Sequence, residues 1–231
     1  MEINYKTALL EYLMQFVSEN KQRLFLEICN FRTHYLTVAI ENVFQAHNAS
    51  AVIRSCDCFG IQDVHIIENG NEYTISPNVA MGASKWLSVH RYNEKENNTV
   101  DGLNYLKSQG FKLVATSPHH FDYQLDDLPL DSKIAILLGT ELEGLSDEAF
   151  QMADYTVNIP MYGFTESYNV SVSAALIMYE LTRRLHNSNL PWKLSEEEKI
   201  DLLLQWTRGT VKSAEALEFA FKEIYRQKLK K

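Results

Sequence analysis

The chain has 231 residues, of which 45% are hydrophobic, and a formal net charge of −8. Its length allows a sizeable core, and the absence of any run of 18 or more apolar residues predicts no transmembrane helix. Three cysteines argue against a disulfide framework, and the N-terminus lacks the basic start of a secretory signal. We therefore expect a cytoplasmic protein; its acidity alone argues against a nucleic-acid partner.

The two ends of the chain are predicted to be helical extensions, over residues 1–35 and 189–231. The first has no glycine or proline, and its apolar residues recur near helical spacing. The second opens with Ser195 and Glu198, the two ends of a capping box. It closes with five lysines or arginines from Lys222 to Lys231. Such a tail usually only favours a helix end, so an RNA contact stays open as the alternative.

The segment between the extensions, residues 36–188, alternates strand and helix patterns and predicts one α/β domain with a mostly parallel sheet. A strand over 35–40, a helix over 49–59 and a strand over 62–68 make the first β-α-β unit. Asn48 is predicted to cap this helix. Arg54 stands among apolar residues and is predicted to be buried, where it needs a partner. Arg54 therefore either forms an internal salt bridge or points into an active site.

Residues 134–184 are the stretch around which the chain is organised. An apolar run leads into Gly139, which predicts a buried strand and then a turn. Ser146 is predicted to start a helix. A short strand stops at Pro160, and a long helix begins near Asn169. We expect two strand ends and one helix N-terminus to meet here, in the crevice where open α/β sheets bind ligands.

Two other classes of site are disfavoured. The pair His119–His120 has no cysteine or carboxylate at metal-ligand spacing, so we predict a loop and no metal site. A dinucleotide-binding oxidoreductase is poorly supported, because no glycine-rich fingerprint follows the first strand.

Three segments, in the right order, resemble the three motifs of the SPOUT class of methyltransferases, and specifically the TrmH-type RNA 2′-O-ribose methyltransferases. They read ENV…HNASAVIR (41–54), LLGTELEGLS (137–146) and IPM…ESYNVSV (159–172). One departure is Tyr168, where the family usually has leucine. The resemblance covers roughly residues 36–185.

The resemblance implies features that residue patterns do not give. It implies a C-terminal trefoil knot in the sheet, S-adenosyl-L-methionine as cofactor, and a homodimer that meets through the knot region. With extensions at both ends, the layout is most similar to family members that methylate guanosine 18 in the D loop of tRNA. The alternatives are the same chemistry on ribosomal RNA, and a non-catalytic RNA-binding factor. No membrane and no metal are expected.

Family roles carry over by position. The matching cofactor-binding positions are Thr116, Gly139, Glu141, Ile159, Met161 and Tyr168. The matching catalytic positions are Asn48, Arg54, Glu141, Ser167 and Asn169. We favour a charged Arg54 that stabilises the developing 2′-alkoxide, or passes its proton on through phosphate or water.

Two further sets of residues are candidates for contact with RNA. Ser167 and Asn169 are predicted either to hold a phosphate at the helix N-terminus or only to cap the helix. The basic tail is the other candidate, together with Lys21, Arg23 and Arg32 of the N-terminal extension.

Overall fold

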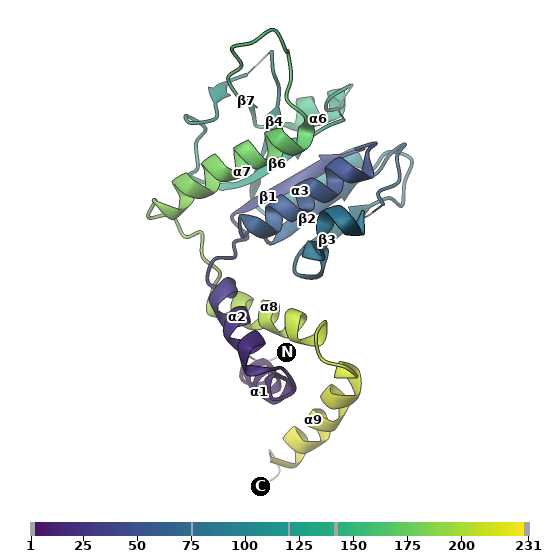
Figure 1. Ribbon diagram of the computed structural model, residues 1–231, viewed down its shortest axis with the longest axis vertical. Coiled ribbons are helices and arrows are strands. Elements are labelled where there is room, and N and C mark those ends of the chain that lie inside the picture. Colours follow the sequence, from purple (N-terminus) through teal and green to yellow (C-terminus); the bar gives the residue numbers. More distant parts are fainter. Residues whose placement is uncertain (1–2, 75, 120, 141–142, 229–231) are drawn as a thin grey trace. The chain divides into compact units, whose positions relative to one another are not determined.

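The computed structural model describes residues 3–74, 76–119, 121–140 and 143–228 (Figure 1). They form two compact units. The first, here called the sheet unit, is Thr33–Trp192. The second, the terminal unit, combines the N-terminal residues up to Arg32 with the C-terminal residues from Lys193.

Seven strands of the described residues form one sheet with the order β3-β2-β1-β6-β4-β7-β5. Their bounds are β1 Leu36–Glu41, β2 Asp63–Ile67, β3 Ser88–Tyr92, β4 Phe111–Thr116, β5 Tyr123–Gln124, β6 Lys133–Leu138 and β7 Tyr155–Asn158. Every pairing between these strands is parallel. The predicted α/β fold with a mostly parallel sheet is confirmed.

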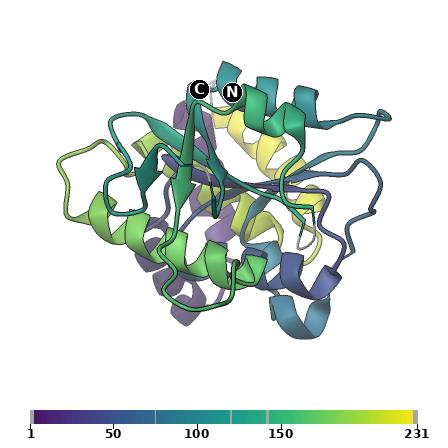
Figure 2. The same cartoon turned by 90° about the horizontal axis from the view of Figure 1, so that it is seen from above.

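Helices cover both faces of this sheet, as a parallel sheet requires. They are α3 Ala46–Cys58, α4 Pro77–Ala80, the 3-10 turn Ala83–Lys85, α5 Thr99–Ser108, α6 Asp147–Met152 and α7 Val170–His186. α3 and α7 pack on one face, and α5 and α6 pack on the other (Figure 2). The sheet therefore has two apolar layers, and its strand ends are left for the loops.

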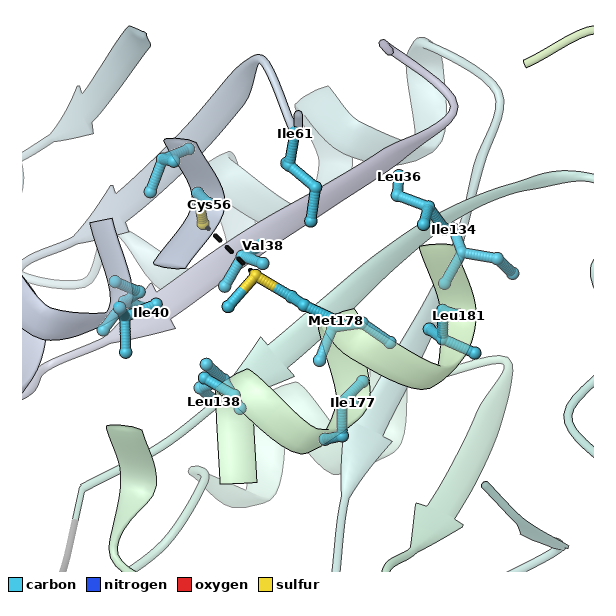
Figure 3. Packing of buried hydrophobic residues seen from close by; sticks show 14 of the residues in the cluster. Leu36, Val38, Ile40, Cys56, Ile61, Ile134, Leu138, Ile177, Met178 and Leu181 are labelled. Atoms are coloured by element: carbon cyan, nitrogen blue, oxygen red, sulfur yellow. Dashed lines mark hydrogen bonds between the residues drawn. The ribbon is translucent and has the colours of Figure 1, made fainter. Parts of the chain in front are cut away.

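The larger layer lies between the sheet and the helix pair α3–α7. Leu36, Val38 and Ile40 alternate along β1 and point toward these helices, whereas Ala39 faces the opposite layer. Figure 3 shows the Cys56 thiol of α3 against the Met178 sulfur of α7, at 3.6 Å. This buried contact fixes α7 beside α3, and so fixes the N-terminus of α7 near the strand ends.

Several local predictions are wrong in their bounds. α3 begins at Ala46 with Gln45 as its N-cap residue, so Asn48 lies inside the first turn and does not cap the helix. β5 has only two residues, too few for a periodic pattern. Arg54, predicted to be buried, is exposed.

The terminal unit contains α1 Ile3–Met14, α2 Glu19–Cys29, α8 Glu196–Arg208 and α9 Ala214–Lys228. A small core joins α1, α8 and α9 through Leu9, Leu13, Leu204 and Phe221. The predicted capping box is present: the Ser195 amide donates to the Glu198 carboxylate at 2.7 Å, and the Glu198 amide donates to the Ser195 hydroxyl at 3.3 Å.

Arg32 of the terminal unit does not face solvent. Its side chain is buried, and its guanidinium lies over the Trp206 ring at 5.4 Å from the centroid. The prediction that Arg32 contacts RNA is therefore wrong. Within the described part of the chain, no helix has the length and apolar character needed to cross a membrane.

Candidate active site

A cavity of about 510 Å³ opens at the carboxyl ends of β4, β6 and β7. Thr116 ends β4, Gly139 follows β6, Ile159 follows β7, and Val170 begins α7; all four line it. The predicted meeting of two strand ends and a helix N-terminus is confirmed, with β4 as a third strand end. The volume is within the usual range of small-molecule sites.

Gly139 allows the chain to fold back tightly over the cavity. A Cβ atom at this position would lie 2.1 Å from the carbonyl carbon of Gly144 and 2.3 Å from the amide nitrogen of Leu145. Thr140 and Gly144 exchange backbone hydrogen bonds of 2.9 and 3.2 Å across the same turn. Gly144 has φ +73°, which disfavours any residue with a Cβ. Only glycine therefore fits at position 139 in this backbone.

Asn158 anchors the opposite wall. It is buried at the end of β7, and its side-chain amide donates to the carbonyl oxygens of Pro118 at 2.9 Å and Ser117 at 3.3 Å. These bonds tie the loop after β4 to β7 at the cavity. Sequence reasoning missed Asn158, because its partners lie 40 and 41 residues away in the chain.

Tyr168 lines the cavity and closes the loop between β7 and α7. Its hydroxyl donates to the carbonyl of Pro160 at 3.2 Å, which joins the two ends of that loop. The tyrosine found where the family usually has leucine thus adds a hydrogen bond that leucine lacks.

A pair of asparagines stands at the N-terminus of α7. The Asn169 side-chain oxygen accepts from the Ser171 amide at 2.9 Å, so Asn169 caps the helix. Its side-chain nitrogen donates to the Asn48 side-chain oxygen at 3.2 Å. Ser167, two residues earlier, is exposed and lines the cavity. Asn169 therefore caps α7 and also holds Asn48 of α3 beside the cavity, and its predicted contact with a phosphate stays a prediction.

Arg54 lies apart from these groups. It is not among the residues that line the cavity, and in the described part of the chain no side chain forms an ion pair with it. Its α3 neighbours Val52, Ile53 and Cys56 are buried on the sheet side, which leaves position 54 on the outer face of the helix.

Glu41, at the end of β1, belongs to the first motif but has a structural position. Its buried carboxylate accepts from the Ser146 amide at 2.9 Å and from the Ser146 hydroxyl at 2.7 Å. It also accepts from the Thr99 hydroxyl. Glu41 thus holds the N-termini of α5 and α6 against the end of β1.

The structure brings most of the predicted site residues together. Five predicted cofactor positions line the same cavity: Thr116, Gly139, Ile159, Met161 and Tyr168. Of the predicted catalytic set, Ser167 also lines it, the Asn48–Asn169 pair adjoins it, and Arg54 is on the outer face of α3. Glu141 lies outside the described residues. No group of three or more histidines, cysteines or carboxylates among the described residues is arranged to hold a metal ion.

The wall of the cavity has a charge that suits a cationic ligand. Glu143 and Glu166 both line it, together with backbone-rich turns and the apolar Leu138 and Ile177. S-adenosylmethionine has an adenine, a sulfonium, an amino group and one carboxylate, so its net charge is positive. Turns at strand ends suit the adenine, and the carboxylates suit the positive charges. The residues present therefore fit this group.

Comparison with known proteins gives the same picture. The SpoU rRNA methylase family matches residues 35–179. The chain belongs to this family. The methyltransferase resemblance of the three motifs is thus confirmed, and the chain is an RNA 2′-O-methyltransferase that uses S-adenosylmethionine.

Two relatives of the SpoU family match almost end to end. A tRNA (guanosine(18)-2′-O)-methyltransferase from Borreliella burgdorferi is 42% identical over 206 residues, which cover 89% of this chain and 93% of that protein. A protein of the same name from Aquifex aeolicus is 32% identical and covers 85% of this chain and 92% of its own length.

Solved structures agree with the family assignment. The crystal structure of the A. aeolicus TrmH/SpoU tRNA modifying enzyme aligns with a TM-score of 0.74 at 30% identity, over 84% of this chain and 98% of that one. The SpoU methyltransferase AviRb from Streptomyces viridochromogenes, in complex with AdoMet, aligns with a TM-score of 0.59 at 26% identity over 71% of this chain and 65% of that one.

Proposed function

We propose that this chain methylates the ribose 2′-hydroxyl of guanosine 18 in the D loop of tRNA. The observation that carries the proposal is the match to a tRNA (guanosine(18)-2′-O)-methyltransferase at 42% identity over 89% of this chain. That match extends beyond residues 35–179 and so includes sequence outside the part shared with the whole family.

We assign the binding of S-adenosylmethionine to residues around the cavity. Thr116, Gly139, Ile159, Met161 and Tyr168 are proposed to hold it, and Glu141 is assigned the same role by its place in the motif. When bound, the cofactor supplies an electrophilic methyl group. Asn158 and Gly139 keep the two walls at a fixed separation, because one ties down the loop after β4 and the other permits the turn after β6.

Positioning of the ribose is assigned to the end of α7. The hydrogen bond from Asn169 to Asn48 and the cap of Asn169 on Ser171 hold both asparagines in place. Ser167, two residues before Asn169, lines the cavity. We assign these three side chains to the ribose and its phosphate, since a helix N-terminus favours a negative group. Holding the 2′-oxygen in line with the methyl group supplies a large part of the rate enhancement.

Arg54 is proposed to stabilise the 2′-oxygen as it gains negative charge. Arginine stays charged in proteins and offers a rigid fork of donors. The 2′-hydroxyl proton then passes to a phosphate oxygen or to water, so the arginine need not lose its own proton. Because Arg54 is exposed and free of ion pairs within the described residues, it is available to an RNA phosphate.

The finer features of the architecture are part of the same proposal. They are a trefoil knot in the C-terminal part of the sheet and a homodimer through the knot region. Val172, Leu176 and Tyr179 support the dimer: they recur at helical spacing on α7 and are exposed. A tRNA substrate accords with the expected cytoplasmic location.

The terminal unit is proposed to contribute phosphate contacts. Arg23, Lys222 and Arg226 are exposed on its surface. Basic residues there compensate for the overall charge of −8, because affinity for nucleic acid depends on phosphate neutralisation.

The test is transfer of labelled methyl groups from S-adenosylmethionine to unmodified bulk tRNA and, separately, to ribosomal RNA. We expect label in tRNA, recovered as 2′-O-methylguanosine in the D loop, and its loss in Arg54→Ala. Label in ribosomal RNA alone would move the substrate and keep the chemistry. No label in either RNA, with the cofactor still bound, would favour a non-catalytic RNA-binding factor.

A further inference from the structure

The loop between β7 and α7 carries two aromatic side chains that nothing in the described structure covers. Tyr162 and Phe164 have exposed fractions of 97% and 108%. In Figure 1 the green loop that carries them arches away from the sheet before it descends into α7. We propose that these two rings form a stacking platform for unpaired nucleobases next to the target nucleotide. This inference rests on the proposed function.

The platform adjoins the candidate active site along the chain. Met161 comes directly before it, and Glu166, Ser167 and Tyr168 follow one residue after it; all four line the cavity. Three residues of chain span at most roughly 11 Å, so Phe164 cannot be further than that from Ser167 between Cα atoms. A nucleotide whose ribose is held at Ser167 therefore has neighbours within reach of the platform.

The exposure of these rings contrasts with the other aromatic residues nearby. Tyr168 of the same loop donates a hydrogen bond to Pro160, and Tyr155 of β7 packs edge-on against Tyr123 at 5.4 Å. Among the described residues, neither Tyr162 nor Phe164 has a ring partner or a hydrogen bond. Two exposed rings, two residues apart in one loop, mark a surface that is completed by something else.

The chemistry of the surroundings favours a base as the occupant. Proteins read single-stranded RNA loops by stacking unpaired bases on aromatic rings. The neighbouring wall carries Glu143 and Glu166, whose charge does not favour a phosphate directly beside them. Stacking is indifferent to that charge, because it uses the face of the base. The platform would therefore add affinity for RNA at a place where Glu143 and Glu166 do not attract its phosphates.

The test compares three substitutions at each ring: Phe164→Ala, Phe164→Leu and Phe164→Trp, with the same set at Tyr162. Steady-state methyl transfer to unmodified tRNA gives kcat and KM, and calorimetry gives S-adenosylmethionine affinity. We expect the alanine variants to raise KM for tRNA by about ten-fold or more, from the worth of one stacked base. Leucine should recover little and tryptophan most of the loss, with kcat at saturating tRNA and cofactor affinity near wild type.

The matched control is Met81→Ala, which removes another large apolar side chain, 69% exposed, from a residue that does not line the cavity. It should leave KM unchanged. An unchanged KM in both alanine variants, or full recovery by leucine, would overturn the stacking role while wild-type transfer to tRNA still stands. If Phe164→Ala instead converts a dimer to a monomer in sedimentation, a second copy covers the rings and the inference is wrong. A wild-type protein that transfers no methyl to tRNA would refute the proposed function itself.

Discussion

Two regions of the sheet unit bury polar side chains, and they use them differently. At the outer side of the sheet, the Asp63 carboxylate accepts from His34 Nδ1 and, at 3.2 Å, from His90 Nε2. His65 stacks on His90 with centroids 4.6 Å apart and bonds to the Tyr92 hydroxyl at 2.9 Å. At the strand ends, the buried Asn158 donates to a backbone carbonyl of the loop after β4, and the buried Glu41 accepts from the Ser146 amide.

The first region is a structural cluster, whereas the second builds the candidate active site. In the histidine cluster the polar groups satisfy one another. Burial alone would raise the pKa of Asp63, but hydrogen bonds from His34 and His90 hold it well below its usual range. At the strand ends the buried groups fix loops, and the loops then leave carboxylates and a hydroxyl on a cavity wall. Changes in the first region should alter stability, and changes in the second should alter binding and rate.

Gly139→Ala should be the most damaging single change. The added Cβ would lie 2.1 Å from the Gly144 carbonyl carbon, so the turn over the cavity has to move. We expect S-adenosylmethionine binding to be lost in calorimetry, with a decrease of about 1–3 kcal/mol in the free energy of unfolding.

Gly110→Ala is the matched control. Gly110 has φ +83°, but a Cβ added there would meet no atom within 4 Å, and the residue follows α5 away from the cavity. The variant should lose about 1 kcal/mol of stability and keep cofactor affinity. Equal loss of binding in both variants would show that general destabilisation, and not the cavity, decides the outcome.

Arg54→Ala should come next in size. Removing a group that stabilises developing charge typically lowers kcat by about 10²–10³-fold. Because Arg54 does not line the cavity, calorimetry should give unchanged S-adenosylmethionine affinity. Arg54→Lys keeps the charge and loses the fork of donors. Near-normal turnover by the lysine variant would contradict a role that depends on guanidinium geometry.

Local signals predict much of this site, and long-range contacts lie beyond them. The apolar run before Gly139 and the hydroxyl of Ser146 are readable because strand burial and helix capping depend on neighbours in sequence. Asn158 bonds to carbonyls 40 and 41 residues away, which no local pattern reveals. The prediction that Arg54 is buried is wrong, because its apolar neighbours lie on the sheet-facing side of α3 and Arg54 lies on the other side.

Dependence on long-range contacts also explains why the strand order of the sheet is not predicted from the sequence. Strand and helix alternation predicts parallel β-α-β units, but the order β1-β6-β4-β7 depends on which apolar faces meet, and pairs such as Cys56 with Met178 are 122 residues apart. Hydrophobic periodicity predicts only a crevice at the strand ends. The three motifs, taken together, identify the residues of the site.

A pH titration addresses the histidine cluster. Burial lowers the pKa of His65 to about 4, with His90 adding to this and Asp63 opposing it. Between pH 4 and 6.5 the unfolded chain therefore binds more protons at this position, so stability falls as the pH drops through that window, by about 3 kcal/mol in all. His65→Gln should flatten this part of the curve, measured by urea unfolding at each pH.

That titration separates the two regions. The stabilising contribution of Asp63 is present above its unfolded pKa near 3.8 and is lost as the pH falls, so it changes little across most of the window of His65. His65→Gln should also keep S-adenosylmethionine affinity at neutral pH. A change in that affinity would mean that the cluster and the cavity are coupled.

The weakest effect should come from the basic tail. Truncation from residue 222 would remove Tyr225, which packs on Tyr5 at 5.0 Å, so charge neutralisation is the cleaner change. Lys222→Gln with Arg226→Gln should lower tRNA affinity a few-fold and reduce the slope of log K against log salt by about one unit per lost phosphate contact. Unchanged affinity and slope would remove these two residues from the RNA surface.

The proposed target atom can be tested with one tRNA transcript in two forms, unmodified and with a single 2′-deoxyguanosine at position 18. We predict methyl transfer to the first and none to the second, with equal binding of both RNAs. Equal transfer to the two forms would contradict the proposed function, because the methyl group would then go to another atom or another nucleotide.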